Sequence, residues 1–293
     1  MRQDRGLVLK LAAIAVFWLA LGRFLPDLLW RALPRALLDS LSLPVYSMLC
    51  QVLTTLAGVA VSTWALERPR AVLGLERPAL GHLAISLLLA PALFVVASYV
   101  ALEIAEPYLL AELAREGPGA SRKNAGAFGR AVTQAPLVLT LLWGAVLAAV
   151  AEELAFRGAL FAAIEHALPR RRWFSGPATV ALAGSVFGAM HADMHGSVGI
   201  VRVASTTLLG LACGTARMLS GSVFVAMIVH LAYNSISLGL GRGLFRSDSE
   251  PLVSVVPNRL LALAVVGVLG ALAVIAARRA WGRSTTGPQS TGS

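Results

Sequence analysis

Eight apolar runs dominate the sequence and constrain the fold more than any other feature. They lie at about residues 7–22, 41–65, 80–102, 135–164, 174–192, 197–216, 220–240 and 258–277. A transmembrane helix needs roughly 20 mainly apolar residues, and within lipid only helices and closed barrels satisfy all their backbone hydrogen bonds. The runs therefore predict an all-α, polytopic membrane protein with about eight transmembrane helices.

Composition argues against the main soluble classes. Of the 293 residues, 57% are hydrophobic and 14% are charged, whereas a soluble globular protein has roughly 45–50% apolar and about 25% charged residues. This balance excludes a soluble enzyme, a disordered chain and a nucleic-acid-binding domain. We expect a single integral membrane domain over residues 1–283. The Ser/Thr/Gly-rich residues 284–293 predict a disordered tail.

The net charge of +10 suits a protein whose basic loops face the cytoplasm and anionic lipid head groups. If eight spans place both termini on one side, that side carries more Lys and Arg than the other, including the cluster Arg170–Arg172. We therefore expect cytoplasmic termini. The compact, Ala/Leu/Arg-rich chain suggests the inner membrane of a bacterial cell.

The most informative polar residues are ionisable groups within the apolar runs, because such groups are costly in lipid and usually functional. Glu152 and Glu153 lie within the run 135–164, and Arg157 follows four residues after Glu153. On a helix, that spacing stacks Glu153 and Arg157 on one face, where they can form an ion pair. Glu152 points about 100° away and has no local partner, which makes it a candidate base in a polar cavity of the bundle.

Two histidines and an amide extend this set. His191 ends the fifth run, and His230 lies in the seventh run with Asn234 four residues later on the same helix face. A carboxylate with an imidazole can hold and deprotonate a water, and an imidazole with an amide can stabilise an oxyanion. The set contains no acyl-enzyme nucleophile, so it predicts hydrolysis of an amide by an activated water.

Other intramembrane protease classes lack their signatures here. The sequence has no H-E-x-x-H zinc motif, no G-x-S-G serine motif within a run, and no pair of aspartates within the runs. Each absence removes a competing chemistry.

Three motifs give the chain a family resemblance. Residues 152–157 fit E-E-x-x-x-R, residues 187–191 fit F-x-x-x-H, and residues 230–234 fit H-x-x-x-N. In this order, and within about residues 130–240, they resemble the CPBP (CAAX protease and bacteriocin-processing) family of intramembrane endopeptidases, whose best-known branch is the type II CAAX prenyl endopeptidases. The resemblance implies cleavage of a membrane-anchored or lipidated protein substrate near its C-terminus.

The resemblance also implies roles for individual residues. Glu152 would activate the water and His191 would help to hold it, while His230 and Asn234 would stabilise the oxyanion. Glu153 and Arg157 would form a structural pair. The implied mechanism uses no cofactor. The alternative is a zinc site on Glu152, His191 and His230, with or without His195, because three protein ligands and an open position suit a catalytic zinc.

Two other functions use similar residues. A transporter or proton relay also places Glu and His in the membrane, but it would show inverted repeats, and the Glu-Glu motif has no second copy. An inactive scaffold would have lost a motif residue, and all are present. The role of Arg202 stays open between lining the substrate path and pairing with Glu153.

The depth of His191 also leaves two alternatives. His191 lies at the end of its run, whereas Glu152 and His230 lie within theirs. Either the fifth helix is displaced in depth, or the cavity is a funnel open to one side, since polar groups at depth need a water-filled cavity.

Overall fold

Helices form all the regular secondary structure in the part of the chain that the computed structural model describes, residues 5–117, 126–169, 174–244 and 258–285. The helices are α1 (Arg5–Ala32), α2 (Arg35–Ser40), α3 (Leu43–Ala65), α4 (Pro69–Leu73), α5 (Leu80–Glu116), α7 (Gly126–Gln134), α8 (Leu137–Leu141), η1 (Leu142–Leu147), α9 (Ala148–Glu153), η2 (Leu154–Leu160), α10 (Phe161–Ala167), α11 (Ser175–Ala189), α12 (Gly196–Ser220), α13 (Val223–Gly241) and α14 (Asn258–Thr285). Elements α8 to α10 follow one another without a break and form one central helical segment.

Seven helical segments in the described residues are long and apolar enough to cross a membrane. They are α1, α3, α5, the central segment, α12, α13 and the first 20 residues of α14. The prediction of an all-α, polytopic membrane protein is confirmed, and the number of spans is close to the eight expected.

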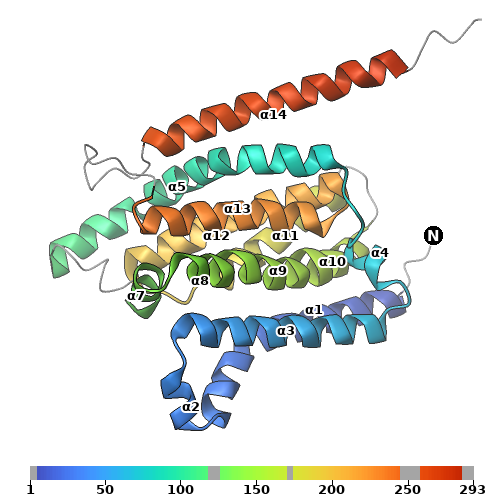
Figure 1. Ribbon diagram of the computed structural model, residues 1–293. Coiled ribbons are helices and arrows are strands. Elements are labelled where there is room, and N and C mark those ends of the chain that lie inside the picture. The colour runs from blue at the N-terminus through green and yellow to red at the C-terminus, as the bar shows by residue number, and fades with distance from the viewer. Residues whose placement is uncertain (1–4, 118–125, 170–173, 245–257, 286–293) are drawn as a thin grey trace, which may run out of the picture.

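The eighth predicted span is the exception. The run 174–192 forms only α11, whose 15 residues reach about 22 Å at 1.5 Å per residue, less than the roughly 30 Å of a bilayer's hydrocarbon core. α11, which forms the fifth predicted run, is therefore short. It ends at Ala189, and this accounts for the position of His191 just after the helix. Figure 1 shows α11 running back alongside α12, and it shows α1 beginning and α14 ending at the same end of the bundle.

Two predictions fall at the edges of the described residues. The first two residues of the predicted disordered tail belong to α14, which extends to Thr285, and residues 286–293 lie outside the described part. The basic cluster Arg170–Arg172 also lies outside it.

Two tight turns lie together at the end of the bundle where α12 turns into α13. Gly221 ends α12 with a φ of 71°, and the hydroxyl of Ser222 accepts a hydrogen bond from the Phe224 backbone N–H at 3.3 Å to begin α13. Gly74 ends α4 with a φ of 71°, and a Cβ there would lie 2.3 Å from the Arg217 guanidinium. The connection before α5 is thus packed against α12, at the end of the bundle where α12 turns into α13.

The central segment carries the Glu-Glu motif. It lies between α1 and α3 on one side and α11 to α13 on the other (Figure 1). Its α9 portion is only six residues long and is flanked by two π-helical stretches, η1 and η2. π-helical turns are rare in proteins, and those that occur are often found at functional sites. Glu152 and Glu153 end the α9 portion, in the middle of the bundle.

Candidate active site

Glycines bring α11 and α12 close together. A Cβ at Gly188 would lie 1.8 Å from Thr207 Oγ1, and a Cβ at Gly210 would lie 2.8 Å from the Gly184 carbonyl oxygen. Gly184 with Gly188, and Gly210 with Gly214, have the G-x-x-x-G spacing that allows helices to approach closely in membranes. This signal is readable in the sequence, although our sequence analysis did not use it. The close packing fixes the end of α11, which His191 follows.

A buried network of three polar side chains, Arg157, Glu153 and His230, lies on one side of the site. Arg157 donates from Nη1 to Glu153 Oε1 at 3.0 Å and from Nη2 to the Gly210 carbonyl at 2.8 Å. The same Glu153 oxygen lies 2.7 Å from His230 Nδ1. The Glu153 and Arg157 side chains are 0% exposed, and that of His230 is 2% exposed. Glu153 thus holds the His230 ring as well as the arginine, a contact that the sequence spacing did not indicate.

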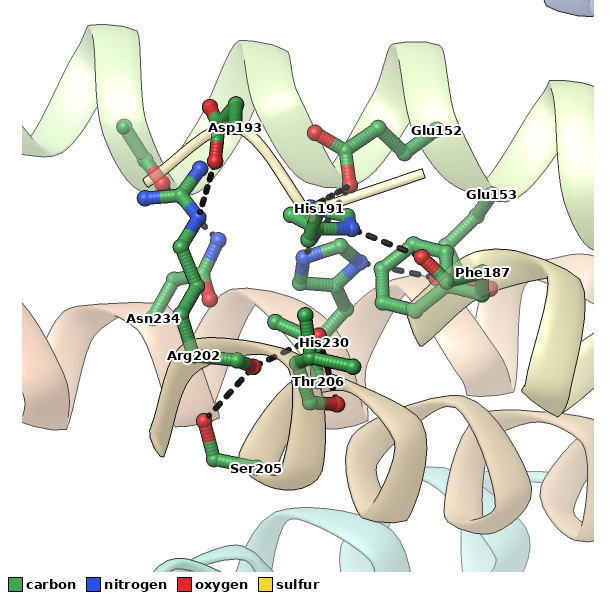
Figure 2. Close-up of polar contacts among 12 residues, drawn as sticks. Glu152, Glu153, Phe187, His191, Asp193, Arg202, Ser205, Thr206, His230 and Asn234 are labelled. Atoms are coloured by element: carbon green, nitrogen blue, oxygen red, sulfur yellow. Dashed lines mark hydrogen bonds and ion pairs between the residues drawn. The ribbon is translucent and has the colours of Figure 1, made fainter. Parts of the chain in front are cut away.

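Glu152 faces a different environment. Its Oε2 atom lies 3.6 Å from His191 Nε2 and 3.9 Å from His230 Nε2 (Figure 2). The side chain is 31% exposed, yet the Oε2 atom is itself buried and accepts no hydrogen bond within the described residues. Both distances exceed a direct hydrogen bond. A water molecule beside this oxygen would find hydrogen-bond partners on three side chains.

The partners of the two rings indicate where their protons lie. His191 Nδ1 is 2.8 Å from the Phe187 carbonyl oxygen, which can only accept, so Nδ1 carries a proton. His230 Nδ1 faces the Glu153 carboxylate and carries one for the same reason. Both Nε2 atoms therefore point towards Glu152. Burial lowers the pKa of His191, but the Glu152 carboxylate raises it by more, so its net pKa lies above the ordinary value.

Phe187 supports the site as the first residue of the F-x-x-x-H motif. Its fully buried ring lies 4.6 Å from the His191 ring and 5.6 Å from the His230 ring, centroid to centroid. The Arg157 guanidinium carbon lies 4.6 Å from the centroid of the same ring. Sequence analysis gave Phe187 no role of its own, and the structure makes it the common packing surface of three polar side chains.

Asn234 reaches the site from α13. Its Nδ2 atom donates to the Gly144 carbonyl oxygen in η1 at 2.9 Å. The amide nitrogen carries a second hydrogen, and the residue lines the same cavity as Glu152, His191 and His230. His195, the possible additional zinc ligand, lines a different pocket between α5 and α12.

Arg202 also lines the main cavity, on α12. Its Nε atom lies 3.1 Å from Asp193 Oδ1, in the loop 190–195 that carries His191 (Figure 2). Of the two roles that the sequence left open, the structure gives Arg202 a place on the cavity wall.

The cavity has a volume of about 850 Å³. Residues of α1 and α3 form one wall and residues of α12 and α13 the other, with Glu152 on the central segment between them. This volume lies within the range of roughly 300–1,000 Å³ that is typical of cavities that hold small ligands. In the described part of the chain, no three His, Cys, Asp or Glu side chains are grouped closely enough for a metal site. The zinc alternative would therefore require Glu152, His191 and His230 to move closer together.

A family model matches the part of the chain that carries the site. Residues 134–236 match the family model described as Type II CAAX prenyl endopeptidase Rce1-like. The matched segment holds all three motifs and the four predicted catalytic residues, Glu152, His191, His230 and Asn234, so the family resemblance is confirmed. The chain matches no curated protein and no solved structure with which it was compared.

Proposed function

We propose that this protein, whose residues 134–236 belong to the CAAX protease family, is an intramembrane endopeptidase that hydrolyses a bond near the C-terminus of a membrane-anchored or lipidated substrate. The observation that carries the proposal is the position of Glu152 Oε2, which is buried, accepts no hydrogen bond within the described residues and faces Nε2 of two histidines. A water at this point has a base beside it and a cavity for a peptide in front of it.

The first step is attack by this water. Glu152 and His191 Nε2 hold it, and Glu152 takes one of its protons as the oxygen bonds to the substrate's carbonyl carbon. The electron pair of the carbonyl double bond moves onto the carbonyl oxygen, which becomes an oxyanion. No acyl-enzyme forms, because water is the nucleophile.

His230 and Asn234 are the proposed donors to the oxyanion. His230 can donate from Nε2 only if its ring is a cation, because Nδ1 already donates to Glu153. The carboxylates of Glu152 and Glu153 flank that cation, and charges alternate in sign along Arg157, Glu153, His230 and Glu152. The second N–H of Asn234 supplies the other donor.

Collapse of the intermediate completes the reaction. The carbon–nitrogen bond breaks, its electron pair goes to the nitrogen, and that nitrogen takes the proton held by Glu152. Glu152 thereby returns to a carboxylate, and the products are a new C-terminal carboxyl group and a free amine. One carboxyl group acts first as base and then as acid.

A zinc-dependent variant of this mechanism has one feature in its favour. The Nδ1 atoms of His191 and His230 are fixed by a carbonyl and a carboxylate, which is how metal-bound histidines are commonly oriented. When bound, the metal would polarise the substrate carbonyl and the water. We propose the metal-free mechanism as the first candidate. We also propose that the protein lies in a bacterial inner membrane with both termini in the cytoplasm.

The test is cleavage by the purified protein in liposomes. Peptides anchored by a prenyl group, an acyl chain or a transmembrane helix would be compared by mass spectrometry, with and without a chelator, beside a His191→Asn variant. We expect cleavage near the C-terminus of at least one anchored peptide, insensitivity to the chelator, and a loss of rate in the variant. Chelator-sensitive cleavage would favour the zinc variant. Folded wild-type protein that cleaves none of them would contradict the proposal and favour a transporter or a scaffold.

A further inference from the structure

The loop 190–195, which carries His191 into the site, lies between two cavities. His191 and Asp193 line the main cavity, whereas His195 lines a second cavity of about 800 Å³ between α5 and α12. Met194 lines both. A segment with a cavity on each side has few neighbouring atoms to pack against. The position of the loop therefore depends on how its two ends are held.

The first end of the loop is held by α11. The His191 backbone N–H donates to the Gly188 carbonyl oxygen at 3.0 Å, and the Ala192 N–H donates to the Ala189 carbonyl oxygen at 3.2 Å. The second end is the start of α12, where the N-cap residue His195 makes no side-chain capping hydrogen bond within the described residues. Because the first N–H groups of a helix lack partners within it, this end needs an acceptor from another part of the chain.

Glu112 of α5 supplies such an acceptor. Its Oε2 atom accepts a hydrogen bond from the Ser197 backbone N–H at 2.9 Å, across 85 positions of the sequence. Both residues are 3% exposed. A carboxylate at the first turn of a helix makes a charge-assisted hydrogen bond and interacts favourably with the helix dipole. Because a carboxylate is costly to bury without donors, this contact holds the first turn of α12 against α5.

The part of α5 that carries Glu112 exceeds the length that a membrane crossing requires. α5 has 37 residues and is about 55 Å long at 1.5 Å per residue, whereas the hydrocarbon core of a bilayer is roughly 30 Å thick. Figure 1 shows its C-terminal part extending past the neighbouring helices, at the end of the bundle where α12 begins. The bond to Ser197 thus connects this extension to the loop beside the active site.

We propose that Glu112 is a positioning residue for the reaction. By capping α12 it fixes the second end of the loop 190–195, and it thereby keeps His191 Nε2 beside Glu152. Glu112 lines the second cavity and acts through the loop, without a role in the chemistry itself. This inference rests on the proposed function, in which His191 holds the attacking water.

The rival explanation is that the contact only attaches α5 to α12. In that case, loss of Glu112 would lower the stability of the whole bundle, and activity would fall only because fewer molecules are folded. A positioning role instead predicts local loosening of the loop and a lower cleavage rate per folded molecule, with the loss transmitted through His191.

The first experiment needs no substrate. Hydrogen–deuterium exchange of residues 190–199 would be followed by mass spectrometry in the full-length protein in detergent. Glu112→Ala removes the acceptor, and Glu112→Gln keeps a carbonyl oxygen but loses the charge. One control is Ser197→Ala, which keeps the backbone N–H. The other is Glu116→Gln, which removes the same charge one turn further along α5, in the lining of the same cavity.

We expect Glu112→Ala to exchange at least about tenfold faster over residues 190–199. Glu112→Gln should lie between it and the wild type, and both controls should exchange as the wild type does. Unchanged exchange in Glu112→Ala would overturn the inference. Equally faster exchange along the whole of α5 and α12 would also overturn it, in favour of the rival explanation.

The second experiment tests whether Glu112 acts through His191. Rates per folded molecule would be compared for the wild type, Glu112→Ala, His191→Asn and the double variant. Because small displacements of catalytic groups are costly, we expect Glu112→Ala to lower kcat by about 10- to 100-fold with a nearly constant KM. The double variant should be no slower than His191→Asn alone, since coupled residues are not additive. Losses that multiply in the double variant would overturn the inference.

The two experiments separate this inference from the proposed function. Wild-type cleavage with the same kcat in Glu112→Ala would sustain the proposed function and overturn the positioning role. Faster exchange of residues 190–199 in Glu112→Ala, with no cleavage by the wild type, would overturn the proposed function and sustain Glu112 as the residue that fixes the loop.

Discussion

Two adjacent glutamates occupy opposite environments in this protein. Glu153 is fully buried and bonded to Arg157 and His230, whereas Glu152 is 31% exposed and its Oε2 atom faces the cavity without a hydrogen bond from the described residues. A step of about 100° around the helix separates them. The comparison teaches that the framework of the site and its reactive group are distinct. Glu153 binds Arg157 and His230 through Oε1 and is closed off from the cavity, although its Oε2 atom, like that of Glu152, accepts no hydrogen bond within the described residues, whereas Glu152 lines the cavity where water and substrate can reach it.

Removing Arg157 from its buried network with Glu153 and His230 should have the largest effect on the stability of the folded protein. Arg157→Met removes the guanidinium that pairs with the buried Glu153 carboxylate, so we expect about 3–5 kcal/mol less free energy of unfolding. Chemical denaturation in detergent, followed by circular dichroism, measures this difference. Arg157→Lys keeps the positive charge but loses the planar guanidinium. Its free energy of unfolding should lie between those of the wild type and Arg157→Met. An Arg157→Met protein as stable as the wild type would show that the buried network does not stabilise the fold around the site.

Asn234 lines the cavity, and Asn234→Ala should slow the hydrolytic step more than it weakens substrate binding. Removal of one oxyanion donor lowers kcat by about 10²–10³, and KM should stay nearly constant because the donor acts mainly in the transition state. Steady-state kinetics with the best peptide of the liposome assay measure both constants. A raised KM with an unchanged kcat would assign Asn234 to substrate binding instead.

The smallest expected effect comes from the packing that places His191. Gly188→Ala puts a Cβ 1.8 Å from Thr207 Oγ1, which forces α11 away from α12 at about 1–3 kcal/mol and displaces the loop 190–195. The readouts are the unfolding midpoint and the cleavage rate. Gly22→Ala is the matched control, because its Cβ would meet only Thr54 at 4.0 Å. Adding Thr207→Ala should restore part of the loss. Full stability and activity in Gly188→Ala would contradict the role of this contact.

The sequence predicted local relations well. The four-residue spacing of Glu153 and Arg157 indicated their ion pair, and the rotation between Glu152 and Glu153 indicated that only one of them is buried in that pair. The family motifs identified residues that lie together in space, including His191 and His230. In each case the relation follows from the period of a helix or from a pattern read along one segment.

Relations between distant segments were not predictable in this way. The contact of Glu153 with His230 joins residues 77 positions apart, and hydropathy contains no information about such a pair. The short α11 was missed because the run 174–192 stays apolar past the point where the helix ends. The π-helical stretches beside Glu152 depart from the 3.6-residue period on which the sequence analysis relied. The pairing of Arg202 with Asp193 likewise depends on how α12 packs.

The central claim is that Glu152 performs the chemistry in a framework that does not depend on it. The most direct measurement is the single-turnover cleavage rate of Glu152→Gln per folded molecule in liposomes, with the unfolding midpoint taken on the same sample. We predict a rate lower by at least about 10² and a midpoint close to that of the wild type, since Glu152 Oε2 accepts no hydrogen bond within the described residues. A Glu152→Gln protein that cleaves at the wild-type rate would contradict the account.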